Sequence, residues 1–177
     1  MQRIINDLMD FTRIRLGGLL PINIQVANVG DACRQAIGEI EALHTDESLA
    51  WSSSGELSGT WDSGRLTQLL MLENAIDHGQ PGGTITIVTE GTADAVTLSV
   101  ANEGRPISPN AVRTIFDPLK YTSDIERPRR AGAGLGLGLF IARQIAQAHG
   151  GTLELRDSDA SGTRFVASLP RALSKPS

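Results

Sequence analysis

The sequence is poor in cysteine, histidine and aromatic residues, and it has no excess of positive charge. Of its 177 residues, one is cysteine, three are histidine and 4% are aromatic, and the formal net charge is −4. The single cysteine, Cys33, excludes an intramolecular disulfide and fits a reducing compartment. A nucleic-acid-binding surface would normally be basic, so the charge balance argues against nucleic acid as a partner.

Long apolar runs are also absent. No stretch approaches the length needed to cross a membrane. The first ten residues contain Asn6, Asp7 and Asp10, which do not fit a secretory signal peptide. A hydrophobic content of 40% is enough for a core. We therefore expect a cytoplasmic protein of one domain, with no membrane contact by this domain.

Two common nucleotide-binding loops are missing. A Walker loop requires Gly-Lys followed by Ser or Thr, and the sequence contains no Gly-Lys. A dinucleotide fingerprint requires G-x-G-x-x-G directly after a strand, but the sixth residue counted from Gly132 is Leu137. The preceding segment, 124–130, is charged and contains Pro128, so it does not read as a strand.

What the sequence does have is a glycine-rich run before a helix-like segment. Glycines 132, 134, 136 and 138 precede the segment 140–149 without a break. Glycine is costly in ordered backbone, so four within seven residues suggest that a ligand approaches the main chain closely. A phosphate held by N–H groups at a helix start is the usual ligand, and a hinge or a tight helix–sheet contact is the alternative.

Periodicity and turn residues predict an α+β fold, a two-layer sandwich in which helices cover one face of a mixed, mostly antiparallel sheet. Capping residues are Asp31, Asp62 or Ser63, and Ser108. The expected helices are 1–15, 32–44, 65–78, 109–116 and 140–148. The expected strands are 19–29, one or two within 48–61, 84–89, 95–101, 152–155 and 163–169, with a long loop at 117–133.

Several short segments, taken in order, carry a family resemblance. They are Leu-Glu-Asn-Ala-Ile-Asp-His-Gly at 72–79, Val-Ala-Asn-Glu-Gly-Arg-Pro-Ile at 100–107, Ile-Phe-Asp-Pro-Leu at 115–119, Gly-Leu-Gly-Leu-Gly-Leu-Phe-Ile at 134–141, and His-Gly-Gly-Thr at 149–152 with Ser-Gly-Thr-Arg-Phe at 161–165. These resemble the N box, first glycine box, F box, second glycine box and final strands of the histidine-kinase/gyrase/chaperone ATPase superfamily. The first glycine box looks most like those of bacterial phytochrome-type kinases.

The resemblance implies a site for ATP and Mg²⁺. Asn74 would offer its amide oxygen to Mg²⁺, which binds few protein ligands beside phosphate and water; the alternative is an amide that bonds nearby backbone. His78 would face phosphate or ribose, or would be an ordinary histidine. Asn102 would read adenine, Ile107 would pack on the ring, and cations at 120, 127, 129 and 130 would lie in a lid. The implied ATP-binding residues are Asn74, His78, Asn102, Gly104, Ile107, Tyr121, Gly134, Leu135, Gly136, Leu137, Gly138, Leu139 and Thr163.

The sequence departs from the family at two points. The N-box helix is two residues short, which corresponds to about 200° of helix rotation, and Leu70 stands where asparagine or a catalytic glutamate is expected. Asn102 replaces the usual aspartate and keeps a neutral acceptor without charge assistance. The absence of a base at Leu70 argues against a gyrase-like or chaperone-like hydrolase. Both departures are compatible with a degenerate nucleotide-binding module that acts through protein contacts, and they leave this alternative open. A third alternative, an anti-sigma-factor type of serine kinase, is disfavoured by the F box.

The resemblance also implies a domain plan. Residues 1–18 would end the second dimerisation helix and its linker, or simply cap the core; residues 19–170 would form the catalytic domain, and 171–177 a disordered tail. His44, His78 and His149 lack the context of a phosphoacceptor, so no catalytic residue is assigned and this chain would not autophosphorylate alone. The implied partners are the dimerisation domain of the same kinase and a response regulator, within a homodimer that could be membrane-tethered elsewhere.

Overall fold

The computed structural model describes residues 2–70, 72–119 and 136–172. In chain order, the elements are α1 (Gln2–Arg15), β1 (Gln25–Asn28), α2 (Val29–Leu43), β2 (Ser48–Ser54), β3 (Ser58–Trp61), α3 (Ser63–Leu69), α4 (Leu72–His78), β4 (Thr84–Gly91), β5 (Ala95–Asn102), α5 (Pro109–Val112), α6 (Gly138–Ala148), β6 (Thr152–Asp159) and β7 (Gly162–Pro170).

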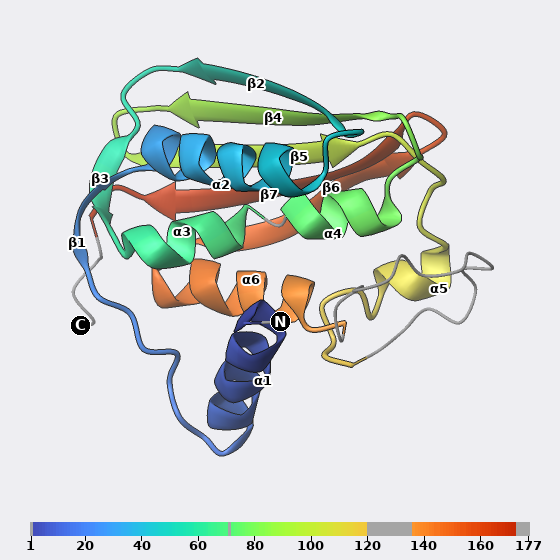
Figure 1. The fold of residues 1–177 in the computed structure, drawn as a ribbon. Helices are drawn as coiled ribbons and strands as arrows, with labels where there is room; N and C mark the ends of the chain where they lie inside the picture. The colour runs from blue at the N-terminus through green and yellow to red at the C-terminus, as the bar shows by residue number, and fades with distance from the viewer. Residues whose placement is uncertain (1, 71, 120–135, 173–177) are drawn as a thin grey trace.

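Five strands form the main sheet in the order β2-β4-β5-β7-β6. The β2–β4 pair is parallel and the other three pairs are antiparallel. Helices α2, α3, α4 and α6 lie on one face of this sheet, and α1 lies beyond α6 (Figure 1). The short strands β1 and β3 form a separate antiparallel pair. The expected two-layer α+β sandwich with a mostly antiparallel sheet is confirmed.

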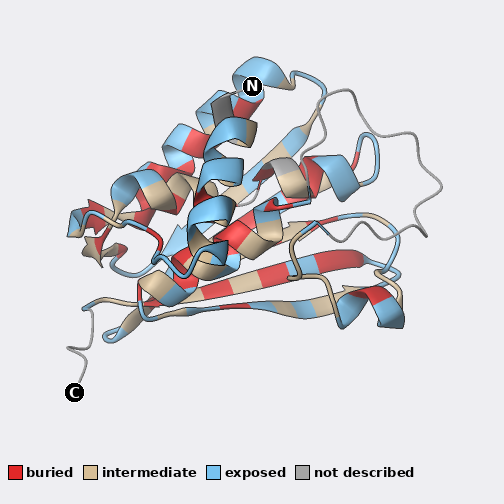
Figure 2. Cartoon of the chain, turned by 90° about the horizontal axis from the view of Figure 1, so that it is seen from below, coloured by how far each residue is buried: buried red, intermediate tan, exposed pale blue. Residues whose placement is uncertain are grey.

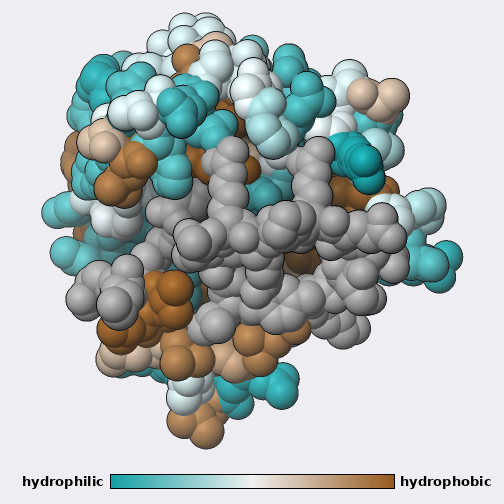
Figure 3. Space-filling view, turned by 45° about the vertical axis from the view of Figure 1, so that its right-hand side comes forward, coloured by the Kyte–Doolittle hydropathy of each residue, from teal (hydrophilic) through white to brown (hydrophobic). Residues whose placement is uncertain are grey.

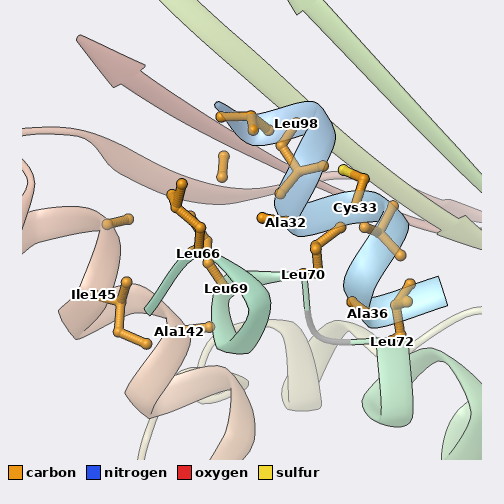
Figure 4. Close-up of a cluster of buried hydrophobic side chains, with 14 of the residues drawn as sticks. Ala32, Cys33, Ala36, Leu66, Leu69, Leu70, Leu72, Leu98, Ala142 and Ile145 are labelled. Carbon is orange, nitrogen blue, oxygen red and sulfur yellow. The ribbon is translucent and has the colours of Figure 1, made fainter. Parts of the chain in front are cut away.

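The core lies between the sheet and the helices. Alternate residues of β4, β5 and β7 are buried, as expected for a sheet covered on one face. Figure 2 shows these alternating bands along the strands. Figure 4 shows side chains from α2, α3, α4 and α6 meeting beside Leu98 of β5. Because these helices share one core, each of them fixes the position of its neighbours.

Several element boundaries differ from the sequence prediction. The strand expected at 19–29 is limited to Gln25–Asn28, since residues before it, including Pro21, pair with no strand. Helix α2 begins at Val29, and its cap is Asn28, whose side chain accepts hydrogen bonds from the N–H groups of Gly30 and Asp31. Helix α5 has four residues and is capped by Ser108 as predicted, but it does not reach Phe116.

The expected continuous helix at 65–78 is wrong, because it divides into α3 and α4. Leu66, Leu69 and Leu70 are buried in the first half, and a continuous helix would bring position 77, seven residues after Leu70, to the same buried face. The buried residues are instead Leu72, Ala75 and Ile76, and Asp77 is exposed. The interruption therefore resets the helical phase, so that both halves face the core despite the shortened N box.

The chain also extends its ordered contacts past the expected boundary at residue 170. The N–H of Thr60 donates to the carbonyl of Arg171 at 2.9 Å, and the Arg171 N–H donates to the carbonyl of Asp94. The Arg171 guanidinium donates to the carbonyls of Glu56, Ser58 and Thr92. Arg171 is thus an anchor and not the start of a disordered tail, while residues 173–177 lie outside the described part.

Helix α1 packs on the domain through one face. Phe11 meets Phe140 of α6 edge to face, with 5.9 Å between ring centroids. Asp10 pairs with Arg65 of α3 at 2.5 and 3.1 Å, and the Gln68 amide donates to Asp7 at 2.7 Å. Its opposite face exposes Ile5, Leu8 and Met9. Figure 3 shows hydrophobic side chains in the lowest part of the view, at the height of α1 in Figure 1. Within the described ranges, no helix is long and apolar enough to span a bilayer.

Candidate functional site

Two buried polar residues face each other where β5 ends and β7 begins. Asn102 pairs directly with Thr163 across the two strands, and they are 8% and 7% exposed. Buried polar side chains normally need partners, so a pair at the edge of a core signals a bound group or a local network. The Asn102 amide nitrogen has one contact, a long 3.5 Å hydrogen bond to the carbonyl of Glu103. No described residue bonds its oxygen.

Ser158 of β6 completes this polar cluster. Its hydroxyl oxygen accepts a hydrogen bond from the N–H of Ile107 at 2.7 Å and lies 3.2 Å from the Thr163 hydroxyl. A β-bulge between Leu155 and Asp157 shifts the register, so that Asp157 pairs with Arg164 and Ser158 pairs with Thr163. Without the extra residue, Ser158 would fall on the opposite face of the sheet.

Ser158 was not predicted as a site residue from the sequence. Strict alternation from buried Leu153 and half-buried Leu155 would have placed Asp157 on the inner face. The polar run at 156–159 was a signal that alternation breaks down there. The bulge thus turns the Ser158 hydroxyl toward the first glycine box. There it accepts the hydrogen bond from the Ile107 N–H that links this box to β6.

Gly104 allows the first glycine box to approach α4. A Cβ at this position would lie 3.3 Å from the carbonyl oxygen of His78 and 3.6 Å from the Asn102 amide nitrogen. The N–H of Gln80 donates to the carbonyl of Glu103 at 2.7 Å, which fixes the end of α4 beside the end of β5. The structure therefore brings Asn102, Gly104 and the α4 terminus together.

Helix α4 carries Asn74 and His78, one turn apart on the same face. Asn74 is half-buried, and its side chain makes no hydrogen bond to a described residue. No cluster of three or more acidic, histidine or cysteine side chains occurs within the described ranges. A single amide oxygen fits Mg²⁺, which keeps water and phosphate as its other ligands. His78 is exposed.

The glycine run leads into the start of α6. Gly136 has a positive φ of 72°, and the helix begins at Gly138. Leu137 stands at the N-cap without a side-chain hydrogen bond, so the first N–H groups have no cap. Leu137 is buried and Leu139 is half-buried. An uncapped helix start with glycine at its first position can bind a phosphate group.

The F-box segment is anchored beside this helix. Phe116 meets Phe165 of β7 edge to face, with 6.1 Å between ring centroids, and the Arg143 guanidinium of α6 lies 4.9 Å from the Phe116 ring centroid. The N–H of Leu119 donates to the carbonyl of Gly136 at 3.3 Å. The segment that precedes the expected lid is thereby connected to the glycine run.

Several predicted residues lie outside the described part of the chain. These are Tyr121, Gly134 and Leu135, together with the cations Lys120, Arg127, Arg129 and Arg130. Their roles stay predictions.

The uncovered face of the sheet has a shallow depression of about 480 Å³. Its walls include Thr86, Ala101 and Arg164, which alternate with buried Ile87, Val100 and Phe165 and therefore point away from the helices. A second hollow of about 450 Å³ lies beside Arg171. The first hollow also reaches Asn102 and Thr163, so it meets the candidate site at the end of β5. Neither hollow includes Asn74 or the start of α6.

Comparison with known proteins identifies the family. Residues 62–173 match the model of the histidine kinase-, DNA gyrase B- and HSP90-like ATPases. The chain belongs to this family. A bacteriophytochrome of Pseudomonas aeruginosa is 31% identical over 173 residues, which are 96% of this chain and 23% of that protein. The sensor histidine kinase CusS of Escherichia coli is also 31% identical, over 96% of this chain and 35% of its own length.

Solved structures support the same conclusion. The catalytic domain of histidine kinase ThkA has a TM-score of 0.72 and 25% identity, and the match covers 85% of this chain and 99% of that one. ThkA in complex with the response regulator TrrA matches at a TM-score of 0.74 and 23% identity, over 99% of this chain and 48% of that one. The resemblance to kinase catalytic domains is confirmed. The chain spans about a quarter to a third of the curated relatives named above.

Proposed function

We propose that this chain is the ATP-binding catalytic domain of a two-component sensor histidine kinase. It would transfer the γ-phosphoryl group of ATP to a histidine on the dimerisation domain of the same kinase, and a response regulator would then receive the group. The observation that carries the proposal is that three elements lie toward the same end of the sheet in Figure 1: the end of β5 with the Asn102–Thr163 pair, helix α4 with Asn74, and the uncapped start of α6.

Each feature has a chemical role in this proposal. Asn102 and Thr163 would bind the purine, and the residues around them, Gly104 and Ile107, would border the base. Asn74 would hold Mg²⁺, which neutralises phosphate charge during transfer, and His78 would lie beside the phosphates or ribose. The N–H groups at residues 136–139 would hold the phosphates. In phosphoryl transfer, positioning and charge stabilisation supply most of the catalysis.

The acceptor histidine would come from outside these 177 residues. His149 is fully buried, its Nδ1 is hydrogen-bonded to the carbonyl of Ile145, and its Nε2 accepts from the N–H of Asp62. Leu70 is an apolar side chain buried in the core and has no ionisable group, so this position offers no base for hydrolysis. These contacts support transfer to another domain over intrinsic hydrolysis.

Helix α1 supplies the connection to that domain in our proposal. Residues 1–18 would be the end of the second dimerisation helix and its linker, residues 19–170 the catalytic domain. The exposed Ile5, Leu8 and Met9 would pack against the other helices of a dimerisation domain, and the full-length protein would be a homodimer. We place this domain in the cytoplasm, with any membrane tether elsewhere in the full-length protein.

A titration with a non-hydrolysable ATP analogue and Mg²⁺ tests the nucleotide site. We expect Asn74→Ala and Asn102→Ala each to weaken binding about tenfold or more, since each removes a polar contact from a partly desolvated site. Asn6→Ala on exposed α1 makes the same chemical change and should leave binding unchanged. Equal affinity of all four proteins would refute the site.

Phosphorylation of a separately supplied dimerisation domain tests the kinase assignment. With radiolabelled ATP, we expect transfer to the histidine of that domain and none to this chain alone. Nucleotide binding without any transfer, even with the domain of a bacteriophytochrome-type relative as acceptor, would favour the degenerate module that acts through protein contacts.

A further inference from the structure

The polar side chains at the base end of the site share one chemical property. Asn102, Ser158 and Thr163 are each able to donate and to accept hydrogen bonds, and none of them carries a charge. The nearby charged pair, Asp157 with Arg164, is on the uncovered face of the sheet. Glu103 is exposed, and its carboxylate accepts from the N–H of Thr84. Glu103, Asp157 and Arg164 line a hollow that Asn102 and Thr163 share, but the hydrogen-bonding groups of the cluster itself are uncharged.

The amide of Asn102 is not held in one orientation. Its nitrogen makes one hydrogen bond of 3.5 Å, at the upper limit of length, and its oxygen makes none to a described residue. Every fully enclosed side-chain N or O atom within the described ranges has a partner, so the unbonded oxygen keeps contact with solvent. A half turn of the amide would exchange oxygen and nitrogen at little cost.

The hydroxyl groups of Ser158 and Thr163 can likewise change between donating and accepting. The Ser158 oxygen accepts from the N–H of Ile107, and either hydroxyl of the Ser158–Thr163 pair can donate to the other. When Ser158 donates, the Thr163 hydroxyl hydrogen is available to a ligand; when Thr163 donates, its lone pairs are available instead. Asn102 and Thr163 can thus each offer a ligand either a hydrogen-bond donor or a hydrogen-bond acceptor.

From this, and on the basis of the proposed function, we infer that the site accepts 6-oxopurine nucleoside triphosphates as well as ATP. The 6-amino group of adenine would donate to the Asn102 oxygen. A 6-oxo group would accept from the Asn102 nitrogen after the amide turns. An aspartate at this position, which the family resemblance leads one to expect, accepts hydrogen bonds but cannot donate, and it would repel an oxo group.

ITP is the suitable probe, because ITP and ATP differ at the 6-position of the ring and in the protonation of the adjacent N1. Dissociation constants for Mg·ATP and Mg·ITP should be measured by calorimetry on this chain and on Asn102→Asp. We expect the two constants of the unchanged chain to agree within about threefold. Asn102→Asp should favour ATP over ITP by at least tenfold, since the oxo group then faces an acceptor.

Asn110→Asp is the matched control, because it adds the same charge at an exposed position of α5 and should leave the ratio of the two constants unchanged. If Asn102→Asp fails to fold, the ratio for the unchanged chain still decides the matter. A tenfold or greater preference of the unchanged chain for ATP would overturn the inference and leave the proposed function standing. If neither nucleotide binds, the proposed function itself fails and the inference fails with it.

Discussion

The backbone N–H of Asp62 donates to Nε2 of the buried His149, at 3.0 Å. The other ring nitrogen, Nδ1, lies 2.7 Å from the carbonyl oxygen of Ile145, so it carries the proton and His149 is held as one neutral tautomer. Asp62 also caps α3 through its side chain, which accepts from the N–H of Arg65. The histidine that caps the C-terminus of α6 thereby fixes the start of the N-box region.

Replacing His149 with phenylalanine should remove both hydrogen bonds and leave the Asp62 N–H without its partner. Burying an unsatisfied donor and losing an internal hydrogen bond together lower the free energy of unfolding by about 2–4 kcal/mol. Urea denaturation measures this loss. His44→Phe, at the end of α2, makes the same substitution where no side-chain hydrogen bond joins two helices, and it should cost less than about 1 kcal/mol. Equal losses in the two variants would contradict the role given to His149.

The Asp10–Arg65 ion pair should stabilise the attachment of α1 to the domain. Both side chains are largely buried, at 11% and 19% exposure, and two parallel contacts join them. A double-mutant cycle with Asp10→Ala and Arg65→Ala should give a coupling free energy of about 1–3 kcal/mol in urea unfolding.

The exposed pair Asp157–Arg164 provides the comparison. Its side chains are about half exposed, so solvent and salt weaken the attraction, and the same cycle there should give about 0–1 kcal/mol. Coupling at Asp10–Arg65 no larger than this value would show that the pair contributes nothing to the attachment of α1.

The parts of the fold that the sequence predicted well are those in which a periodic pattern is bounded by glycine or turn residues. The ends of α1, β4, β5 and α6 fell close to their predicted positions for this reason. Asn28 was missed as the cap of α2 because Asp31 offers the same local signal three residues later. The break between α3 and α4 follows from packing both half-helices on one core, which no local pattern contains.

In the candidate site, too, local sequence patterns predicted some residues, while others depend on tertiary contacts. The glycine run, Asn74 and Asn102 were predicted because their local segments resemble known boxes. Ser158 was not, because its position depends on a bulge that shifts strand register relative to Thr163. The Asp10–Arg65 pair joins positions 55 residues apart, and charge alone does not pair them. Contacts of this kind are set by tertiary structure.

Ser158→Ala should weaken nucleotide binding more than it destabilises the fold. The substitution removes the acceptor of the Ile107 N–H and the partner of Thr163, so the first glycine box loses its tie to β6. We expect affinity for a Mg²⁺-bound ATP analogue to fall about fivefold, the equivalent of roughly 1 kcal/mol. Ser161→Ala removes a hydroxyl that bonds Asp159 in the exposed turn, and it should leave affinity unchanged. A Ser158→Ala protein with full affinity would remove this residue from the site.

Cys33 should give the stability of the protein a dependence on alkaline pH. Burial raises the pKa of its thiol from 9.0 to about 12, although Arg34 lowers it in part. Above about pH 9 the unfolded chain loses this proton while the folded chain keeps it. The folded state then binds more protons, so the free energy of unfolding falls as pH rises from 9 to 12, by at most about 1.4 kcal/mol per pH unit from this group.

Urea unfolding of the unchanged chain and of Cys33→Ala at several values between pH 7.5 and 10.5 separates this contribution from that of other groups. Cys33→Ala leaves a small cavity and should be the less stable protein at pH 7.5. It has no thiol to ionise in the unfolded state, so its disadvantage should shrink steadily above pH 9. A difference that stays constant to pH 10.5 would mean that the thiol ionises equally readily in both states, against the burial of Cys33 in the core.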